Sequence, residues 1–112
     1  MVPVVSDFDG LCEFALNFLL NGEGDARRLA ARLAGLFPDL PALELIFVIA
    51  TAASGMESVF AGPETVAKAQ EAWKIAALLA VDLHQMQVMD LPHATCGDLM
   101  RYWRDEDRFF LA

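Results

Sequence analysis

The stretch from Gly62 to Asp90 has a single proline, Pro63, and no glycine after Gly62. Gly62 suits a helix N-cap, and Pro63 suits the first turn because its missing N–H would have no intrahelical partner there. A helix over about residues 63–89 would be about 40 Å long at 1.5 Å per residue. A rod of that length in a 112-residue chain needs other helices along it. The sequence therefore predicts an all-α, single-domain bundle around a long central helix.

Shorter helices are expected on both sides of the central one. Capping signals and apolar residues at spacings of three and four predict them. The third is apolar nearly all round, so we expect it inside the bundle, and Ser54 with Glu57 predicts a separate short turn after it. The expected ranges are 6–20, 25–36, 42–53, 54–60 and 96–104 or beyond, which with the central helix give five or six helices.

Charge and size limit the classes of protein that fit. A chain of 112 residues is one domain, 1–112, and it is long enough to fold without disulfides or metals. Its net charge of −8 repels nucleic acids and anionic membranes, so we expect neither as a partner. Cys12 and Cys96 are too few and too far apart for a disulfide framework. The expectation is a soluble, acidic, cytoplasmic protein.

The central helix carries the residues predicted to contact a partner. Ala76 and Ala80 belong to a ridge of small side chains that lets another helix approach closely, and Trp73 lies beside it. His84 and Met86 lie near the polar far end. Trp73 could equally pack in the core or line a ligand pocket. Hydrophobic residues make up 56% of the chain, a surplus that a homodimer would bury.

A metal site near His84, His93 and Cys96 is the alternative. Imidazole and thiolate are zinc ligands, and His93 precedes Cys96 by three positions on a turn. However, no second cysteine or histidine follows at short spacing, and in the structural interpretation Asp98 caps a helix while Cys96 packs as a small hydrophobe. The di-iron pattern of Glu-x-x-His on two helices is absent from the sequence. We therefore predict no cofactor and no metal.

Motifs for catalysis are missing as well. The chain has no Gly-x-Ser-x-Gly elbow and no phosphate-binding glycine loop. The C-terminal residues 109–111 are strongly apolar, and we expect them to fold back onto the bundle or onto a partner. The sequence thus predicts a small helical binding or regulatory (adaptor) protein, homodimeric and without catalytic activity. The alternative is a helical protein that binds a small molecule or a metal near His84, His93 and Cys96.

Overall fold

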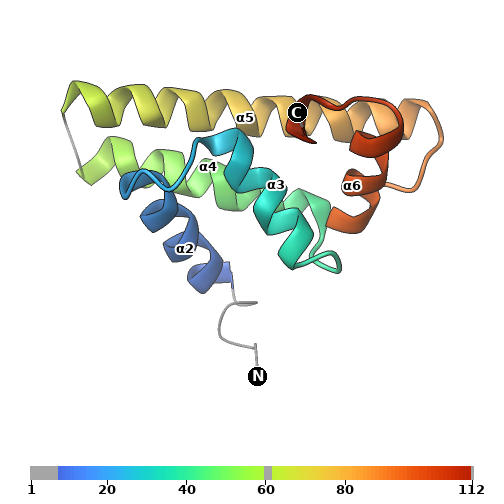
Figure 1. The fold of residues 1–112 in the computed structure, drawn as a ribbon, viewed down its shortest axis with the longest axis horizontal. Coiled ribbons are helices and arrows are strands. Elements are labelled where there is room, and N and C mark those ends of the chain that lie inside the picture. Colours follow the sequence, from blue (N-terminus) through green and yellow to red (C-terminus); the bar gives the residue numbers. More distant parts are fainter. Residues whose placement is uncertain (1–7, 60–61, 112) are drawn as a thin grey trace.

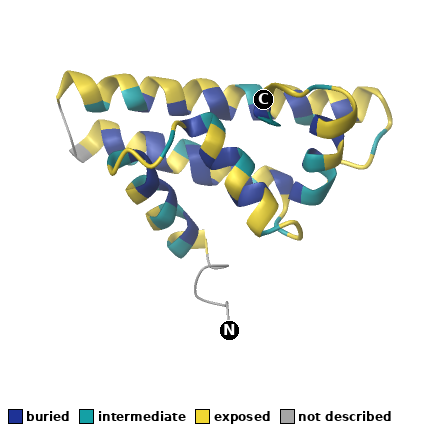
Figure 2. Ribbon diagram, viewed as in Figure 1, coloured by how far each residue is buried: buried dark blue, intermediate teal, exposed yellow. Residues whose placement is uncertain are grey.

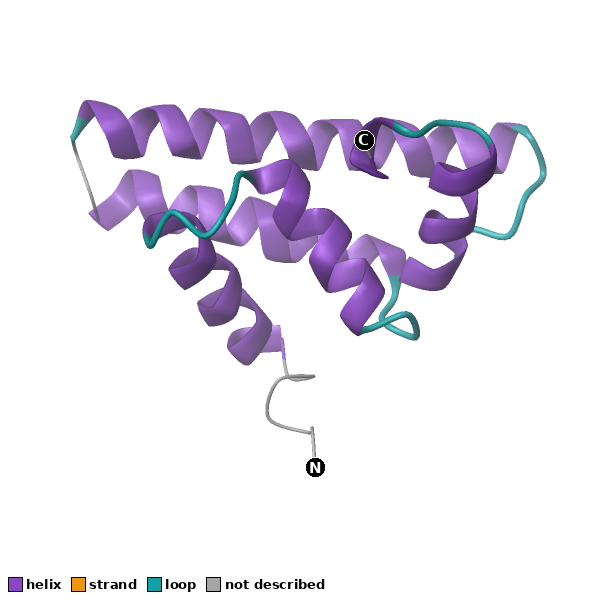
Figure 3. Ribbon diagram, in the orientation of Figure 1, coloured by secondary structure: helices purple, strands orange, loops and turns teal. Residues whose placement is uncertain are grey.

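The computed structural model describes residues 8–59 and 62–111 of the chain. Within these ranges the backbone is helical and contains no strand (Figure 3). The prediction of an all-α bundle of five or six helices is confirmed. The elements are α2 (Phe8–Leu20), α3 (Ala26–Leu36), α4 (Ala42–Val59), α5 (Pro63–Val88), α6 (Cys96–Asp105) and the short 3₁₀ helix η1 (Phe109–Leu111).

The long helix α5 spans the length of the molecule (Figure 1). Gly62 is its N-cap with extended backbone, and Pro63 occupies the first turn, as the sequence predicts. The helix ends at Val88, and Asp90 follows with a positive φ of 59°. A left-handed residue after the last turn is a common helix stop, and Asp tolerates that conformation better than most residues. The predicted range of 63–89 is therefore correct to within one residue.

The other helices pack along α5. Helix α4 runs beside it and makes the most extensive contact of any helix pair, while α3 crosses in front of α4 and α6 lies at the far end (Figure 1). The molecule measures 42 × 32 × 20 Å. Since one helix with its side chains is about 10 Å across, the bundle is two helices thick. A slab of this kind has little interior, so many apolar residues remain near a surface.

The middle of α5 corrects one prediction. Residues 75–81 are apolar all round, which predicts cover on every side, but Ala77 and Ala80 are exposed and Val81 is 60% exposed. Leu79 and Ala76, on the other side of the same turns, are buried. Figure 2 shows buried positions along the edge of α5 that faces the bundle and exposed positions along its outer edge. The prediction was wrong because α5 lies at the edge of the slab.

Helix α4 corrects two further predictions. It continues through Ser54 to Val59 as one helix, so the separate turn predicted for 54–60 does not form, and Phe60 lies outside the described residues. The Ser54 carbonyl accepts a hydrogen bond from the Ser58 hydroxyl at 2.9 Å. The helix is also not wholly interior. Val48 and Ile49 face the core, whereas Phe47 is 51% exposed.

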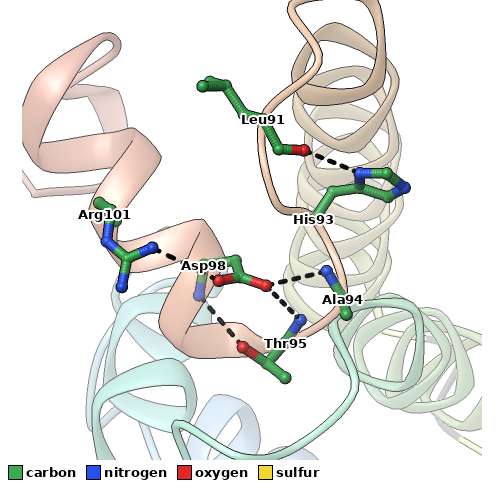
Figure 4. Close-up of polar contacts among 6 residues, drawn as sticks. All are labelled: Leu91, His93, Ala94, Thr95, Asp98 and Arg101. Atoms are coloured by element: carbon green, nitrogen blue, oxygen red, sulfur yellow. Dashed lines mark hydrogen bonds and ion pairs between the residues drawn. The ribbon is translucent and has the colours of Figure 1, made fainter.

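Capping side chains fix the shorter helices where the sequence placed them. Asp25 caps α3 by accepting the Arg28 amide at 2.9 Å. Thr95 and Asp98 form a capping box at the start of α6, with each side chain bonded to the other's backbone N–H (Figure 4). Ser6, predicted to help start the first helix, lies outside the described residues. Each cap satisfies backbone donors that would otherwise lack partners.

The C-terminal segment folds back onto the bundle, as predicted. Phe110 is buried and stacks on Trp103 with ring centroids 4.7 Å apart. The segment before α6 is likewise tied to the body, because the Cys96 amide donates to the Leu40 carbonyl at 2.8 Å. None of the helices in residues 8–59 and 62–111 has the length and apolar character to cross a membrane.

Candidate protein-contact surface

Three of the predicted contact residues on α5 lie on one exposed line. Trp73, Ala80 and His84 are exposed, and spacings of seven and four place them on the same side of a helix. Ala76 and Met86 are buried, at 6% and 0% exposure. The part of the alanine ridge that includes Ala76 is thus used inside the bundle, and Met86 fills the core. Of the five predicted contact residues, Trp73, Ala80 and His84 are therefore the ones that can reach another molecule.

The outer side of α4 extends this surface. Leu43 and Phe47 are more than half exposed, and Phe47 lies beside Trp73, which is 41% exposed. A shallow hollow of about 320 Å³ joins α2, α4 and α5 at this point. Its lining consists of Phe8, Phe47, Ala50, Thr51, Ser54 and Trp73.

A second hollow adjoins the first, with Phe8 and Phe47 in the walls of both. Its volume is about 440 Å³, and its remaining lining residues are Pro41, Leu43 and Glu44. We define the apolar face as the surface formed by Phe8, Leu43, Phe47, Trp73, Ala77 and Ala80. Large exposed apolar groups gathered in one place are unusual on a monomer and mark contact sites more often than isolated ones do.

The electrostatics of the apolar face differ from those of the chain as a whole. The protein has sixteen acidic residues in 112, yet the two hollows contain a single carboxylate, that of the half-buried Glu44. The face offers apolar side chains and a few hydroxyl groups, Thr51 and Ser54, at its edge. Such a surface suits contact with another apolar surface better than it suits an ionic ligand.

The polar cluster after α5 has a structural role. Asp98 accepts the amides of Ala94 and Thr95 and forms a 3.7 Å ion pair with Arg101 (Figure 4). His93 is exposed, and its Nδ1 lies 2.9 Å from the Leu91 carbonyl oxygen. These contacts hold the turn between α5 and α6 in place, and they occupy both oxygens of the Asp98 carboxylate.

The residues of the metal alternative are not arranged as ligands. Cys96 is fully buried, and burial, with a smaller contribution from Glu44, raises the pKa of its thiol to about 12. A metal requires the thiolate, which this environment disfavours. Across the described ranges, no three His, Cys, Asp or Glu side chains are grouped so as to hold a metal ion.

A small-molecule site near these residues has little room. The hollow between the α5–α6 turn and α6 measures about 60 Å³ and is lined by Leu91, Pro92, Asp98, Arg101, Tyr102, Asp105 and Glu106. Ligand pockets usually measure about 300–1,000 Å³. The hollow is therefore small for a ligand pocket.

A buried carboxylate is the feature that sequence analysis missed. Asp82 on α5 is 6% exposed, and Oδ2 accepts a hydrogen bond of 3.0 Å from Nε1 of Trp103 on α6. Burial raises the pKa of Asp82 to about 6, and the Asp107 carboxylate adds to the shift while the Trp103 bond opposes it. The available signal was an acidic residue directly after the apolar run 75–81, on the side of α5 that faces the core.

Comparison with protein-family models, with curated proteins and with solved structures finds no match to this chain. The geometry of its own residues is therefore the basis for assigning a class.

Proposed function

We propose that this protein is a small helical binding module that pairs with a second copy of itself through the apolar face and acts as an adaptor or regulatory protein without catalytic activity. The observation that carries the proposal is the group of exposed large apolar side chains, Phe8, Leu43, Phe47 and Trp73, on one side of the slab. Complete burial of an exposed side chain of this size contributes about 1.5–3 kcal/mol.

Charge favours a second copy that meets this face with its own apolar face. Each chain has a net charge of −8, so two copies repel wherever their acidic surfaces approach. Glu44 is the one carboxylate in the lining of the two hollows, so pairing of the apolar faces brings few like charges together. A symmetric pairing of identical faces is also the commonest form of homo-oligomer.

Small side chains support close pairing of the two α5 helices. Ala77 and Ala80 are exposed on the same side of α5 as Trp73. Alanines at a helix crossing let the axes come near the lower end of the usual 8–10 Å range. In an antiparallel arrangement, the large Trp73 of each copy would lie beyond the alanines and toward His84 of the other copy.

The assignment to binding rests on how the polar groups are used. Asp25 and Asp98 cap helices, Asp107 accepts the Phe109 amide in a turn, and Asp82 accepts the Trp103 N–H. Both cysteines are free thiols, which is compatible with the cytoplasm as the place where the protein works.

The mass of the protein in solution tests the proposal. At ten-micromolar concentration, light scattering should give twice the 12.3 kDa of one chain. Phe47→Glu should yield a monomer, because each dimer would bury two added carboxylates. The matched control is Leu36→Glu, which changes an equally exposed leucine on α3, outside the apolar face, and should leave the dimer intact. A monomeric wild type, or a dimer that both variants disrupt equally, would refute the proposal.

A further inference from the structure

The segment after α6 is held to the bundle through one shared residue, Trp103. The indole ring is fully buried, with its Nε1 on Asp82 and its ring face stacked on Phe110. Phe110 in turn meets Phe109 edge to face at 5.1 Å. A change at Asp82 therefore acts directly on the residue that holds the C-terminal segment in place.

A single arginine holds the outer end of this segment. Nη1 of Arg27, on α3, donates a 3.0 Å hydrogen bond to the Phe109 carbonyl, and its guanidinium lies 5.4 Å from the centre of the Phe109 ring. Both contacts are near the surface, where they are weak. Residues 107–111, which we call the clasp, therefore depend mainly on the Trp103–Phe110 stack.

The charge on Asp82 opposes closure of the clasp. An ionised carboxylate at this position is buried with one hydrogen-bond donor, which is costly, and the Asp107 carboxylate at the start of the clasp repels it. The protonated carboxyl keeps an oxygen to accept the Trp103 N–H and removes both penalties. Asp82 is 6% exposed, so full hydration of the ionised group requires Trp103 or the clasp to move.

The charged groups on the neighbouring helices do not compensate Asp82. In the described part of the chain the one ion pair joins Asp98 to Arg101. Burial raises the pKa of Tyr102, and the nearby carboxylates of Asp82, Asp107 and Glu106 add to this rise. The other charged side chains on the packed elements are Arg27, Arg28 and Arg32 on α3, Glu44 and Glu57 on α4, and Arg104 and Asp105 on α6.

We propose that residues 107–111 form a pH-dependent clasp, which the protonated Asp82 carboxyl keeps closed over Trp103 and the ionised carboxylate opens. The clasp is independent of the dimer, because residues 107–111 and the residues that hold them, Arg27, Asp82 and Trp103, are not part of the apolar face. The Trp103 and Phe110 rings are exposed by opening near neutral pH. In mildly acidic conditions the closed clasp covers them.

Hydrogen exchange of the clasp amides tests this proposal in the intact protein. The readouts are the protection factors of the Asp107 and Leu111 amides, which bond to the Tyr102 and Arg108 carbonyls. Between pH 5 and pH 8 these protection factors should fall about tenfold, as expected for a carboxyl that titrates near 6 when closed and near 4 when open. Amides in the middle of α4 report global unfolding, which also releases Asp82, so their protection factors should fall in parallel but stay well above those of the clasp amides at both pH values.

Two variants and a control decide the cause. Asp82→Asn should keep the clasp amides equally protected at both pH values, whereas Asp105→Asn, at an exposed position on α6, should behave like the wild type. Asp107→Asn should fold normally and make the fall in clasp protection slightly smaller, since it removes one repulsion that favours opening. Constant wild-type protection, or a tenfold fall that persists in Asp82→Asn, would overturn the proposal. If Asp82→Asn does not fold, a fall in clasp protection that is as large in Asp107→Asn as in the wild type overturns it.

Discussion

Nε1 of Trp103 and Oδ2 of Asp82 are 3.0 Å apart in the buried contact between α6 and α5. The bond joins residues 21 positions apart and fixes the far end of the long helix to the last helix of the bundle. It satisfies the indole donor, which rarely lacks a partner when buried. The carboxylate gains less, because one donor does not replace the water that it loses.

Replacement of Asp82 by Asn should change how stability depends on pH. The pKa of Asp82 is raised to about 6 in the folded state, above its ordinary value of 3.8, so the folded protein binds the proton more tightly between these values. Its contribution to stability is therefore present below pH 4 and lost as the pH rises to 6, by about 2–3 kcal/mol. Between pH 4 and pH 6 the unfolding free energy of the wild type should therefore fall relative to that of Asp82→Asn. Urea unfolding at several pH values measures it, and a constant difference would contradict the assignment.

Trp103→Phe should separate the hydrogen bond from the ring stack. Phenylalanine can still stack on Phe110 but leaves Asp82 without its donor, at a cost of about 1–3 kcal/mol. The loss should be larger at pH 7.5 than at pH 5, because the ionised carboxylate needs the donor more. Urea unfolding at the two pH values is the measurement. Equal losses at both would show that the ring, and not the bond, carries the effect.

The helices were predictable from sequence because their ends depend on local chemistry. Three helix starts are marked by a side-chain or backbone property that needs no tertiary contact. The residues are Gly62 with Pro63 for α5, Asp25 for α3, and Thr95 with Asp98 for α6. Ser54 misled the prediction for the same reason. A Ser-x-x-Glu pattern is a start signal only where the backbone leaves the helix, and at Ser54 the preceding turns continue without a break.

The faces of the helices were less predictable. Phe47 and Val48 are both apolar, yet one is half exposed and the other buried, and nothing local distinguishes them on a helix that is apolar all round. Trp73 and His84, both predicted to contact a partner, are exposed on one side of α5, whereas Met86, predicted with them, fills the core. Which side of α4 and α5 faces outward depends on how α3 and α6 pack, and that information is spread over the whole chain.

Thr95→Ala should weaken the attachment of α6. The threonine hydroxyl accepts the Asp98 amide at 3.2 Å, and its loss should lower the unfolding free energy by about 1 kcal/mol. Ser58→Ala removes a hydroxyl that bonds only within its own helix, so it should change stability by less than about 0.5 kcal/mol. Thermal or urea unfolding of the two variants, compared with wild type, gives both values. Similar losses in both would mean that the capping box contributes little.

Salt should strengthen the proposed dimer. Two chains of charge −8 repel at long range, and no ion pair is expected across an apolar face with few charges, so screening reduces the repulsion without weakening the contact. Raising NaCl from 20 to 300 mM shortens the Debye length from about 20 Å to about 6 Å, so the dimer dissociation constant should fall several-fold. Sedimentation equilibrium at the two salt concentrations measures the constant. Lys74→Glu, near Trp73 on α5, makes the net charge of each copy more negative by two and should make the salt dependence steeper. A dissociation constant that rises with salt would instead indicate an interface held by opposite charges, and would place the contact away from the apolar face.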